Sequence, residues 1–262
     1  MSLANQFAAY TAWRSRLSSH VGEFQGWLTK NELSDGQTDL RLTQLLERLR
    51  EDRLNVAFVA EFSRGKSELI NAIFFADYGN RMLPSSAGRT TMCPTELLFE
   101  ASKQPCIELL PIQTRATNSG VTEYKSFPDE WTVVPLDTES PDAMQEALRH
   151  VSETTRVTPE EAASLGFEVG QGEVELYRVG EDGLVEVPRW RHAMINFPHP
   201  LLKQGLVILD TPGLNAIGAE PELTLSQLPN AHAVLFILAA DTGVTQSDLA
   251  IWKEHICGGG TP

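Results

Sequence analysis

Three consecutive residues, Gly65, Lys66 and Ser67, have the types and the setting that bind phosphate. They follow an apolar, strand-like run that ends at Ala60, and they open a helix-like stretch that continues from Glu68. A glycine-lysine-serine turn between a strand and a helix points backbone N–H groups and a helix N-terminus at phosphate oxygens. In such a P-loop the lysine reaches the β- and γ-phosphates, and the serine hydroxyl binds Mg²⁺. We therefore predict a P-loop here.

Ala60 is the one position that departs from the motif G-x-x-x-x-G-K-[ST], because it stands where the first glycine is expected. If that position requires a positive φ, an alanine there costs about 1–2 kcal/mol. If φ is negative, the substitution costs little. The sequence leaves both alternatives open.

Two further stretches provide groups for the same chemistry. Asp210 directly follows the apolar run 206–209, and an acidic residue at the end of a buried strand can hold Mg²⁺ through water. Gly213 can offer its N–H to a γ-phosphate, and Thr91 lies in a loop that loss of that phosphate would release. Together with the P-loop they predict an Mg²⁺-dependent nucleotide site with Ser67, Thr91 and Asp210 around the metal.

The chain around these motifs alternates between strand-like and helix-like stretches. Runs rich in Val, Ile and Leu that alternate with helices are typical of an α/β fold built on a doubly wound, mostly parallel sheet. In the last predicted helix, Leu249 and Trp252 face inward. The predicted strands span residues 54–60, 95–100, 106–111, 206–210 and 233–240, with the second and third paired as a hairpin, and the predicted helices span residues 66–75 and 245–256.

Two helices are predicted ahead of the first strand. Residues 3–30 place apolar side chains three and four apart, in a seam that Arg14 interrupts, and a second helix follows from Thr38 to Arg53. They form a predicted helical hairpin, residues 1–53, beside the nucleotide domain. Because two helices bury one seam poorly, we expect a further partner for it.

The net charge of −14 is concentrated in one segment, since residues 117–187 hold sixteen acidic and four basic side chains. We predict an acidic insertion there, with helices at 141–153 and 159–165. It is interpreted as a solvated surface, with recruitment of a basic partner as the alternative. An acidic chain of this kind disfavours nucleic acid as a partner.

Composition places the chain in a reducing compartment. The three cysteines, Cys93, Cys106 and Cys257, have no metal-like spacing, and their odd number argues against a disulfide framework. Apolar runs stay well short of a membrane span, and the first residues lack the basic start and apolar core of a signal peptide. We expect a cytoplasmic protein.

Four stretches resemble the dynamin superfamily of large GTPases, and bacterial dynamin-like proteins most of all. The resemblance covers residues 54–255 apart from the acidic segment, and the N-terminal hairpin resembles the helices that join a neck bundle in that family. The four stretches are Glu61–Ala72, Arg89–Leu97, Leu209–Leu214 and Val234–Asp241.

The resemblance implies a GTPase-type P-loop NTPase that hydrolyses GTP with Mg²⁺ and remodels membranes. It matches Lys66 and Ser67 to the P-loop, Thr91 to switch I, and Asp210 with Gly213 to switch II. It matches Ser63 to a serine that organises the attacking water. Arg64 lies beside the phosphates and is interpreted either as an arginine finger or as a solvent-facing residue. The residues expected to contact GTP or GDP are Ala60, Glu61, Phe62, Ser63, Arg64, Gly65, Lys66, Ser67, Glu68, Asp210 and Gly213.

Two departures from the family pattern qualify the expectation. Glu68 places negative charge where a small hydroxyl residue often follows the serine, and the guanine-reading motif [NT]-K-x-D is absent from the chain. We expect that motif beyond residue 262, so residues 54–262 are interpreted as a dynamin-type G domain that is incomplete at its C-terminus, with an insertion at about 117–187. The isolated chain is expected to hydrolyse GTP weakly or not at all.

The implied partners are guanine nucleotide and a second G domain. In the complete protein we expect peripheral association with the inner face of the membrane, through another part of the protein. One alternative is an interaction module with impaired nucleotide binding, which uses the helical seam and the acidic insertion. Another is an ATPase, because the base-reading motif does not lie in this chain.

Overall fold

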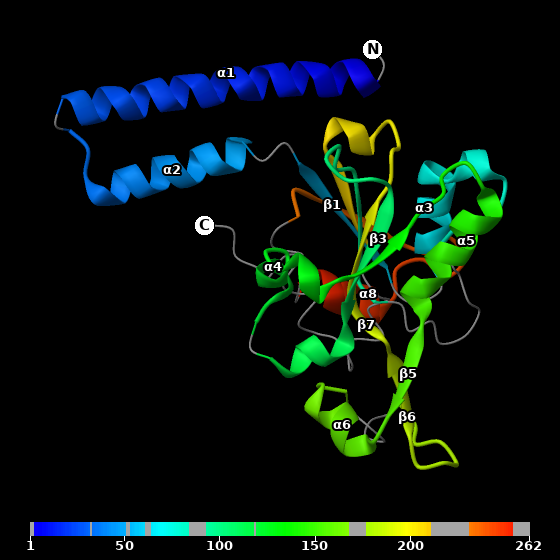
Figure 1. The fold of residues 1–262 in the computed structure, drawn as a ribbon. Coiled ribbons are helices and arrows are strands. Elements are labelled where there is room, and N and C mark those ends of the chain that lie inside the picture. Colours follow the sequence, from blue (N-terminus) through cyan, green and yellow to red (C-terminus); the bar gives the residue numbers. More distant parts are fainter. Residues whose placement is uncertain are drawn as a thin grey trace. The chain divides into compact units, whose positions relative to one another are not determined.

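The computed structural model describes residues 3–31, 33–50, 53–60, 64–83, 93–117, 119–167, 177–210 and 231–253. The chain separates into two compact units, Met1–Leu54 and Asn55–Pro262. The first holds a pair of helices, and the second holds a sheet with helices packed on it (Figure 1). None of the described helices combines the length and the apolar character that crossing a bilayer would require.

The first unit is a hairpin of α1 (Leu3–Lys30) and α2 (Gly36–Arg50). The predicted helix over residues 3–30 is confirmed at both ends. The second helix begins two residues before Thr38, because Asp35 precedes it and accepts the Thr38 N–H at 2.7 Å through Oδ1. That backbone hydrogen bond and one from the Thr38 hydroxyl lower the pKa of Asp35.

The two helices hold one another through buried leucines and one amide. Leu28 and Leu46 are buried, while Gln25 Nε2 donates to Asp39 Oδ1 at 2.7 Å and to Thr43 Oγ1 at 3.1 Å. Large side chains elsewhere on α1 stay exposed, in two stacked pairs whose ring centres lie 5.9 and 6.2 Å apart. These pairs are Tyr10 with Trp13 and Phe24 with Trp27.

Seven strands form one sheet in the order β4-β3-β7-β2-β8-β1-β9. The parallel pairs are β1 with β9 and β2 with β7, and the antiparallel pairs include β2 with β8, β3 with β4 and β3 with β7. The α/β fold class is confirmed, with a mixed sheet where the sequence predicts a mostly parallel one. The strands are β1 (Leu54–Ala60), β2 (Thr95–Leu98), β3 (Cys106–Pro111), β4 (Thr132–Pro135), β7 (Trp190–Asn196), β8 (Leu206–Asp210) and β9 (Ala233–Ile237).

The predicted hairpin of the second and third strands is wrong. β7 lies between β2 and β3 and pairs with both. The sequence does not mark β7 as a strand because Arg191 and His192 interrupt its apolar character, although His192 is fully buried. A hydrogen bond between His192 Nε2 and Glu96 lowers the cost of that burial.

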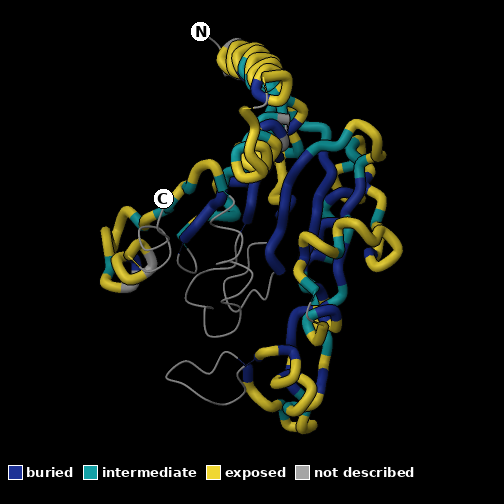
Figure 2. Tube along the Cα trace, turned by 90° about the vertical axis from the view of Figure 1, so that its left-hand side faces the viewer, coloured by how far each residue is buried: buried dark blue, intermediate teal, exposed yellow. Residues whose placement is uncertain are grey.

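The main core lies on one face of the sheet. Phe58, Leu97, Ile195 and Ile208 of the strands meet apolar side chains of α3 (Lys66–Phe74) and α5 (Pro141–Arg149). Figure 1 shows these two helices side by side against the sheet, and Figure 2 shows the strands as the most buried part of the second unit. The P-loop helix and a helix of the acidic segment therefore share one core.

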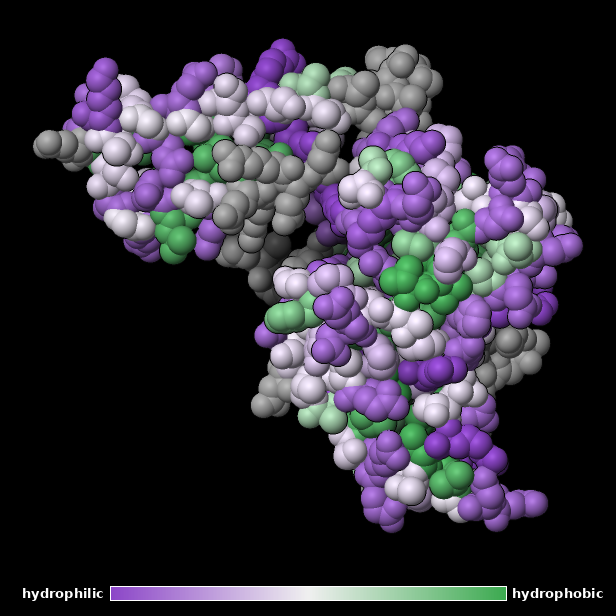
Figure 3. Space-filling view, viewed as in Figure 1, coloured by the Kyte–Doolittle hydropathy of each residue, from purple (hydrophilic) through white to green (hydrophobic). Residues whose placement is uncertain are grey.

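The acidic segment divides into two parts. Its first half adds β4 and α5 to the main sheet and core, so it is not a detached, solvated insertion. Its second half makes a small lobe of its own around Ile112, Phe167 and Val185. That lobe contains α6 (Pro159–Ser164) and an antiparallel pair of β5 (Thr154–Val157) with β6 (Val185–Pro188). The face of the second unit seen in Figure 3 is largely hydrophilic, with small apolar patches.

The predicted strands at residues 54–60, 106–111 and 206–210 are confirmed at both ends. The elements predicted at 66–75, 95–100, 141–153, 159–165 and 233–240 are shorter, and a 3₁₀ turn, His150–Ser152, follows α5. The ends of the helices predicted at 38–53 and 245–256 reach residues outside the described part of the chain. α4 (Val121–Tyr124) is a single turn. In α8 (Gln246–Ile251), Leu249 and Trp252 are 47% and 45% exposed, so the prediction that they face inward is wrong.

Candidate nucleotide site

Gly65, directly before α3, has the backbone geometry that a P-loop glycine provides. Gly65 caps α3 with φ +84°, in the left-handed region that favours glycine. Ala60 is the last residue of β1, is fully buried, and is paired in register with Ile237 of β9. Ala60 is therefore extended and does not need a positive φ. An alanine in place of the first glycine of the motif thus costs little.

Lys66 and Asp210 meet in the structure. Lys66 begins α3 and Asp210 ends β8, and Lys66 Nζ lies 2.7 Å from Asp210 Oδ1. Their side chains are only 12% and 9% exposed. Because β1 and β8 are neighbours in the sheet, the helix that follows β1 meets the C-terminal end of β8. The fold thus brings together Lys66 and Asp210, which the sequence places 144 positions apart.

The oxygen donors next to this pair fit Mg²⁺. The hydroxyl of half-buried Ser67 and the carboxylate of Asp210 are the hard oxygen ligands that this ion prefers. No group of three or more His, Cys, Asp or Glu side chains is placed to hold a metal ion in the part of the chain that the structure describes. An ion held by one or two protein oxygens and by substrate phosphates suits such a site.

Glu68, which departs from the family pattern, directs its charge to a neighbour. Its Oε1 lies 3.1 Å from Arg81 Nε, and both side chains are substantially exposed. In the first turn of α3 an acidic residue is also favourable to the helix dipole. The carboxylate of Glu68 is thus partnered within the protein.

Arg64 is not a free, solvent-facing side chain. Its guanidinium donates a hydrogen bond to Thr242 Oγ1, in the turn after β9, and the residue is half-buried. The turn is held in place by Asp241, whose Oδ1 accepts the Thr242 N–H at 2.9 Å. The sequence gives no signal for this contact, because it joins residues 178 positions apart.

Several predicted site residues lie outside the described residues. They are Glu61, Phe62, Ser63, Thr91 and Gly213. Their assigned roles stay predictions. The residues that the structure does bring together are Arg64, Gly65, Lys66 and Ser67 at the start of α3 and Asp210 at the end of β8.

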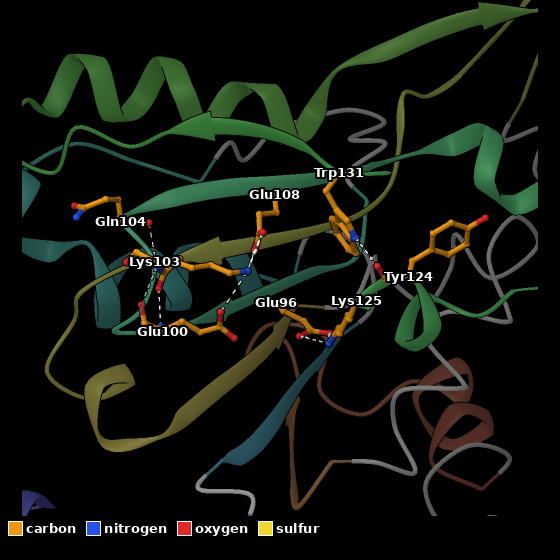
Figure 4. A network of polar contacts seen from close by, with 9 residues as sticks. Glu96, Glu100, Lys103, Gln104, Glu108, Tyr124, Lys125 and Trp131 are labelled. Carbon is orange, nitrogen blue, oxygen red and sulfur yellow. Dashed lines mark hydrogen bonds and ion pairs between the residues drawn. The ribbon is translucent and has the colours of Figure 1, made fainter. Parts of the chain in front are cut away.

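A buried charged network that no sequence motif predicts lies in β2, next to the residue that pairs with Asp210. Glu96 is 5% exposed and receives hydrogen bonds from Lys125 Nζ at 2.7 and 2.8 Å and from His192 Nε2 at 3.2 Å. Burial opposes ionisation of Glu96, but these two partners outweigh it and lower its pKa to about 2. Figure 4 shows Lys125 against Glu96, with Trp131 Nε1 donating to Tyr124 O at 2.9 Å.

This network is connected to the site through the sheet. Thr95, which precedes Glu96, is paired in register with Asp210 across β2 and β8. The only sequence signal for the network is a glutamate inside an otherwise apolar strand.

The sheet, the loop and the paired motifs define a P-loop GTPase fold. The model of the dynamin family matches residues 56–260. This chain belongs to the dynamin family, and the resemblance inferred from the four stretches is confirmed.

This chain spans less than two fifths of the length of each of the similar proteins. The chain is 24% identical over 260 residues to a bacterial dynamin-like protein of Nostoc punctiforme, an alignment that covers 94% of this chain and 30% of that protein. Two similar solved structures are described as an oligomerised bacterial dynamin pair that senses and tethers membranes over long range. One is 19% identical with a TM-score of 0.39, covering 77% of this chain and 23% of its own. The other is 15% identical with a TM-score of 0.45, covering 97% and 37%.

Proposed function

We propose that this chain is the N-terminal portion of a dynamin-like GTPase that binds GTP with Mg²⁺ and hydrolyses the bond to its γ-phosphate. The observation that carries the proposal is the buried ion pair of Lys66 with Asp210. It joins a cation suited to phosphate with a carboxylate suited to a hydrated metal ion, at the ends of two adjacent strands. Family membership supports the same reading, and it favours GTP over ATP.

Five described residues have a role in this proposal. Gly65 and the N-terminus of α3 present N–H groups to the phosphates, and Lys66 turns from Asp210 to the β- and γ-phosphates. The hydroxyl of Ser67 and the carboxylate of Asp210 would hold Mg²⁺. Bound Mg²⁺ supplies neutralisation of the phosphate charge. Arg64 reaches that charge only after it leaves Thr242.

The residues outside the described part complete the proposed reaction. Ser63 and Thr91 would orient the attacking water, and Gly213 would bind the γ-phosphate through its N–H. In the complete protein we propose that turnover is coupled to pairing of G domains and to membrane remodelling. The membrane contact then lies outside this chain, and the helical hairpin of α1 and α2 belongs to a bundle with other helices.

Calorimetry with a non-hydrolysable GTP analogue and Mg²⁺ tests the proposal. Lys66→Ala should abolish binding, while Lys253→Ala, which changes an exposed lysine after α8, should bind like the wild type. Competition by excess GTP but not ATP would establish the base. Equal competition by ATP would show phosphate recognition without base selectivity, because the guanine-reading motif is absent from this chain.

Absence of binding by the wild-type chain would overturn the proposed function. It would favour an interaction module instead. The observation behind that alternative is the pair of exposed aromatic stacks on α1.

A further inference from the structure

One side of α1 exposes large side chains at the spacing of a coiled-coil seam. These residues recur alternately three and four apart, which makes them positions a and d of consecutive heptads. The aromatic residues Tyr10, Trp13, Phe24 and Trp27 are between 44% and 52% exposed. The a positions are Tyr10, Leu17 and Phe24, and the d positions are Trp13, His20 and Trp27.

This seam is separate from the side of α1 that holds α2. Gln25, whose amide donates to Asp39 and Thr43, and the buried Leu28 are positions b and e of the same heptads. Positions b and e lie to one side of a and d on the helix surface. α1 therefore has the two contact sides of a helix in a four-helix bundle, and α2 occupies one of them.

The charges beside the a and d seam fix the direction in which a partner helix fits. Arg16 and Glu23 are both exposed and both stand at position g, one heptad apart. In an antiparallel pair of identical helices, position g faces position g of the other copy, so Arg16 meets Glu23 twice about the two-fold axis. In a parallel pair, position g faces position e, which offers the uncharged Val21 and Leu28.

The same antiparallel pair also matches the aromatic side chains. When it is centred between residues 18 and 19, the stack of Tyr10 with Trp13 lies against the stack of Phe24 with Trp27 of the second copy. Glu23 keeps room for a partner, because its 3.6 Å contact with His20 in the same helix leaves both side chains more than 70% exposed.

The exposed surface is large enough for a specific contact. An aromatic side chain buries about 150–250 Å² when it is covered, so four half-exposed ones in each of two copies supply about 600–1,000 Å². Leu17, His20 and the g positions bring the total near the roughly 1,200 Å² at which stable interfaces begin. A reversible dimer is the expected outcome.

We propose that α1 pairs antiparallel with α1 of a second copy of this chain, so that two hairpins form a four-helix bundle. The a and d positions form the contact, and Arg16 of each copy pairs with Glu23 of the other. This inference names the partner of the hairpin in the bundle proposed above, and it rests on that part of the proposed function alone. It does not involve the nucleotide site.

Sedimentation equilibrium of the chain without nucleotide, from micromolar to submillimolar concentration, tests the aromatic contact. The wild type should be a reversible mixture of monomer and dimer. Trp13→Ala and Trp27→Ala should each weaken the dimer at least about tenfold, as expected for a tryptophan lost from an interface centre. Trp252→Ala is the matched control, because it removes a tryptophan of similar exposure, 45%, from the other unit. It should leave the dissociation constant within about twofold of the wild type.

A charge exchange tests the direction of the pair. Arg16→Glu and Glu23→Arg should each weaken the dimer about three- to thirtyfold at low salt, because two attractive pairs become repulsive. The double variant Arg16→Glu/Glu23→Arg restores opposite charges and should return to within about twofold of the wild type. Arg149→Glu makes the same change of net charge in the other unit, on an exposed side chain, and should leave the dimer intact.

The outcomes separate this inference from the proposed GTPase activity. A wild type that stays monomeric, or a dimer that survives both tryptophan variants, would overturn the inference. A double charge variant as weak as the single ones would do the same, because it would exclude the antiparallel direction. Calorimetry should show that Trp13→Ala binds the GTP analogue like the wild type, so loss of the dimer leaves the nucleotide proposal in place. Far-UV circular dichroism checks that each variant keeps its helix content.

Discussion

Replacing Lys66 by methionine keeps most of the length of the side chain and leaves the Asp210 carboxylate without its partner. Removing one member of a buried ion pair costs about 3–5 kcal/mol, because the other charge stays desolvated. Both side chains of this pair retain some exposure, 12% for Lys66 and 9% for Asp210. We therefore expect the lower end, about 3 kcal/mol. At about 2–4 °C per kcal/mol for a unit of this size, the midpoint of thermal unfolding should fall by roughly 6–12 °C.

The partner substitution should cost less. In Asp210→Asn the lysine stays charged, but its long side chain can turn its ammonium toward water. The double variant Lys66→Met/Asp210→Asn has no isolated charge and should recover most of the loss. A coupling energy of about 2 kcal/mol is expected from the complete cycle.

The assay must report the unit that holds the pair, because the chain has two compact units. Urea unfolding that is monitored by hydrogen exchange of the amides in β1 and β8 reports the unit that holds the pair. Both single variants remaining within about 0.5 kcal/mol of the wild type would refute the reasoning, since that is the scale of ordinary surface changes. So would strictly additive losses in the double variant.

Three further outcomes follow from other residues. The pKa of Glu96 is lowered from 4.5 to about 2 in the folded protein. The ionised carboxylate therefore contributes about 3 kcal/mol of stability above pH 4.5, and this contribution is lost as the pH falls toward 2. Glu96→Gln should accordingly flatten the acid side of a curve of stability against pH. Thr242→Val removes the acceptor that holds Arg64, and calorimetry should show GTP-analogue affinity rising about two- to tenfold; unchanged affinity would mean that the contact does not compete with phosphate. In urea unfolding, Gly65→Ala should lower the free energy of unfolding by about 1–2 kcal/mol from its positive φ alone, since no atom lies within 4 Å of an added Cβ. Ala60→Gly restores the motif but should lower the free energy of unfolding by about 0.5–1 kcal/mol, because Ala60 lies in a strand.

The parts of the fold that the sequence predicts well are those whose pattern is local. The strands 54–60 and 206–210 are uninterrupted apolar runs with a chemical motif directly after them, so both their bounds and their meeting at one sheet end can be predicted. α1 is equally clear from its regular spacing of apolar side chains.

β7 shows why the rest is not predictable in this way. Arg191 and His192 look like surface residues until the fold supplies their partners. Arg191 Nη1 donates to Thr114 O at 2.8 Å and to Ser119 O at 3.1 Å, and His192 is hydrogen-bonded to Glu96. Without β7, strands 95–98 and 106–111 look like consecutive neighbours. The partner of Arg64 is equally hidden in the sequence, because its acceptor Thr242 comes from the opposite end of the G domain.

The charge of the acidic segment and its position in the fold are set by different residues. Its carboxylates give residues 117–187 their negative charge, and on α5 they include Asp142 and Glu146 on the exposed side. The opposite side of the same helix carries Met144 and Leu148, which are fully buried against residues that flank the segment 84–92. Charge therefore describes only the solvated side of α5, and its position in the core is set by a few apolar side chains and by one uncharged amide, Gln145.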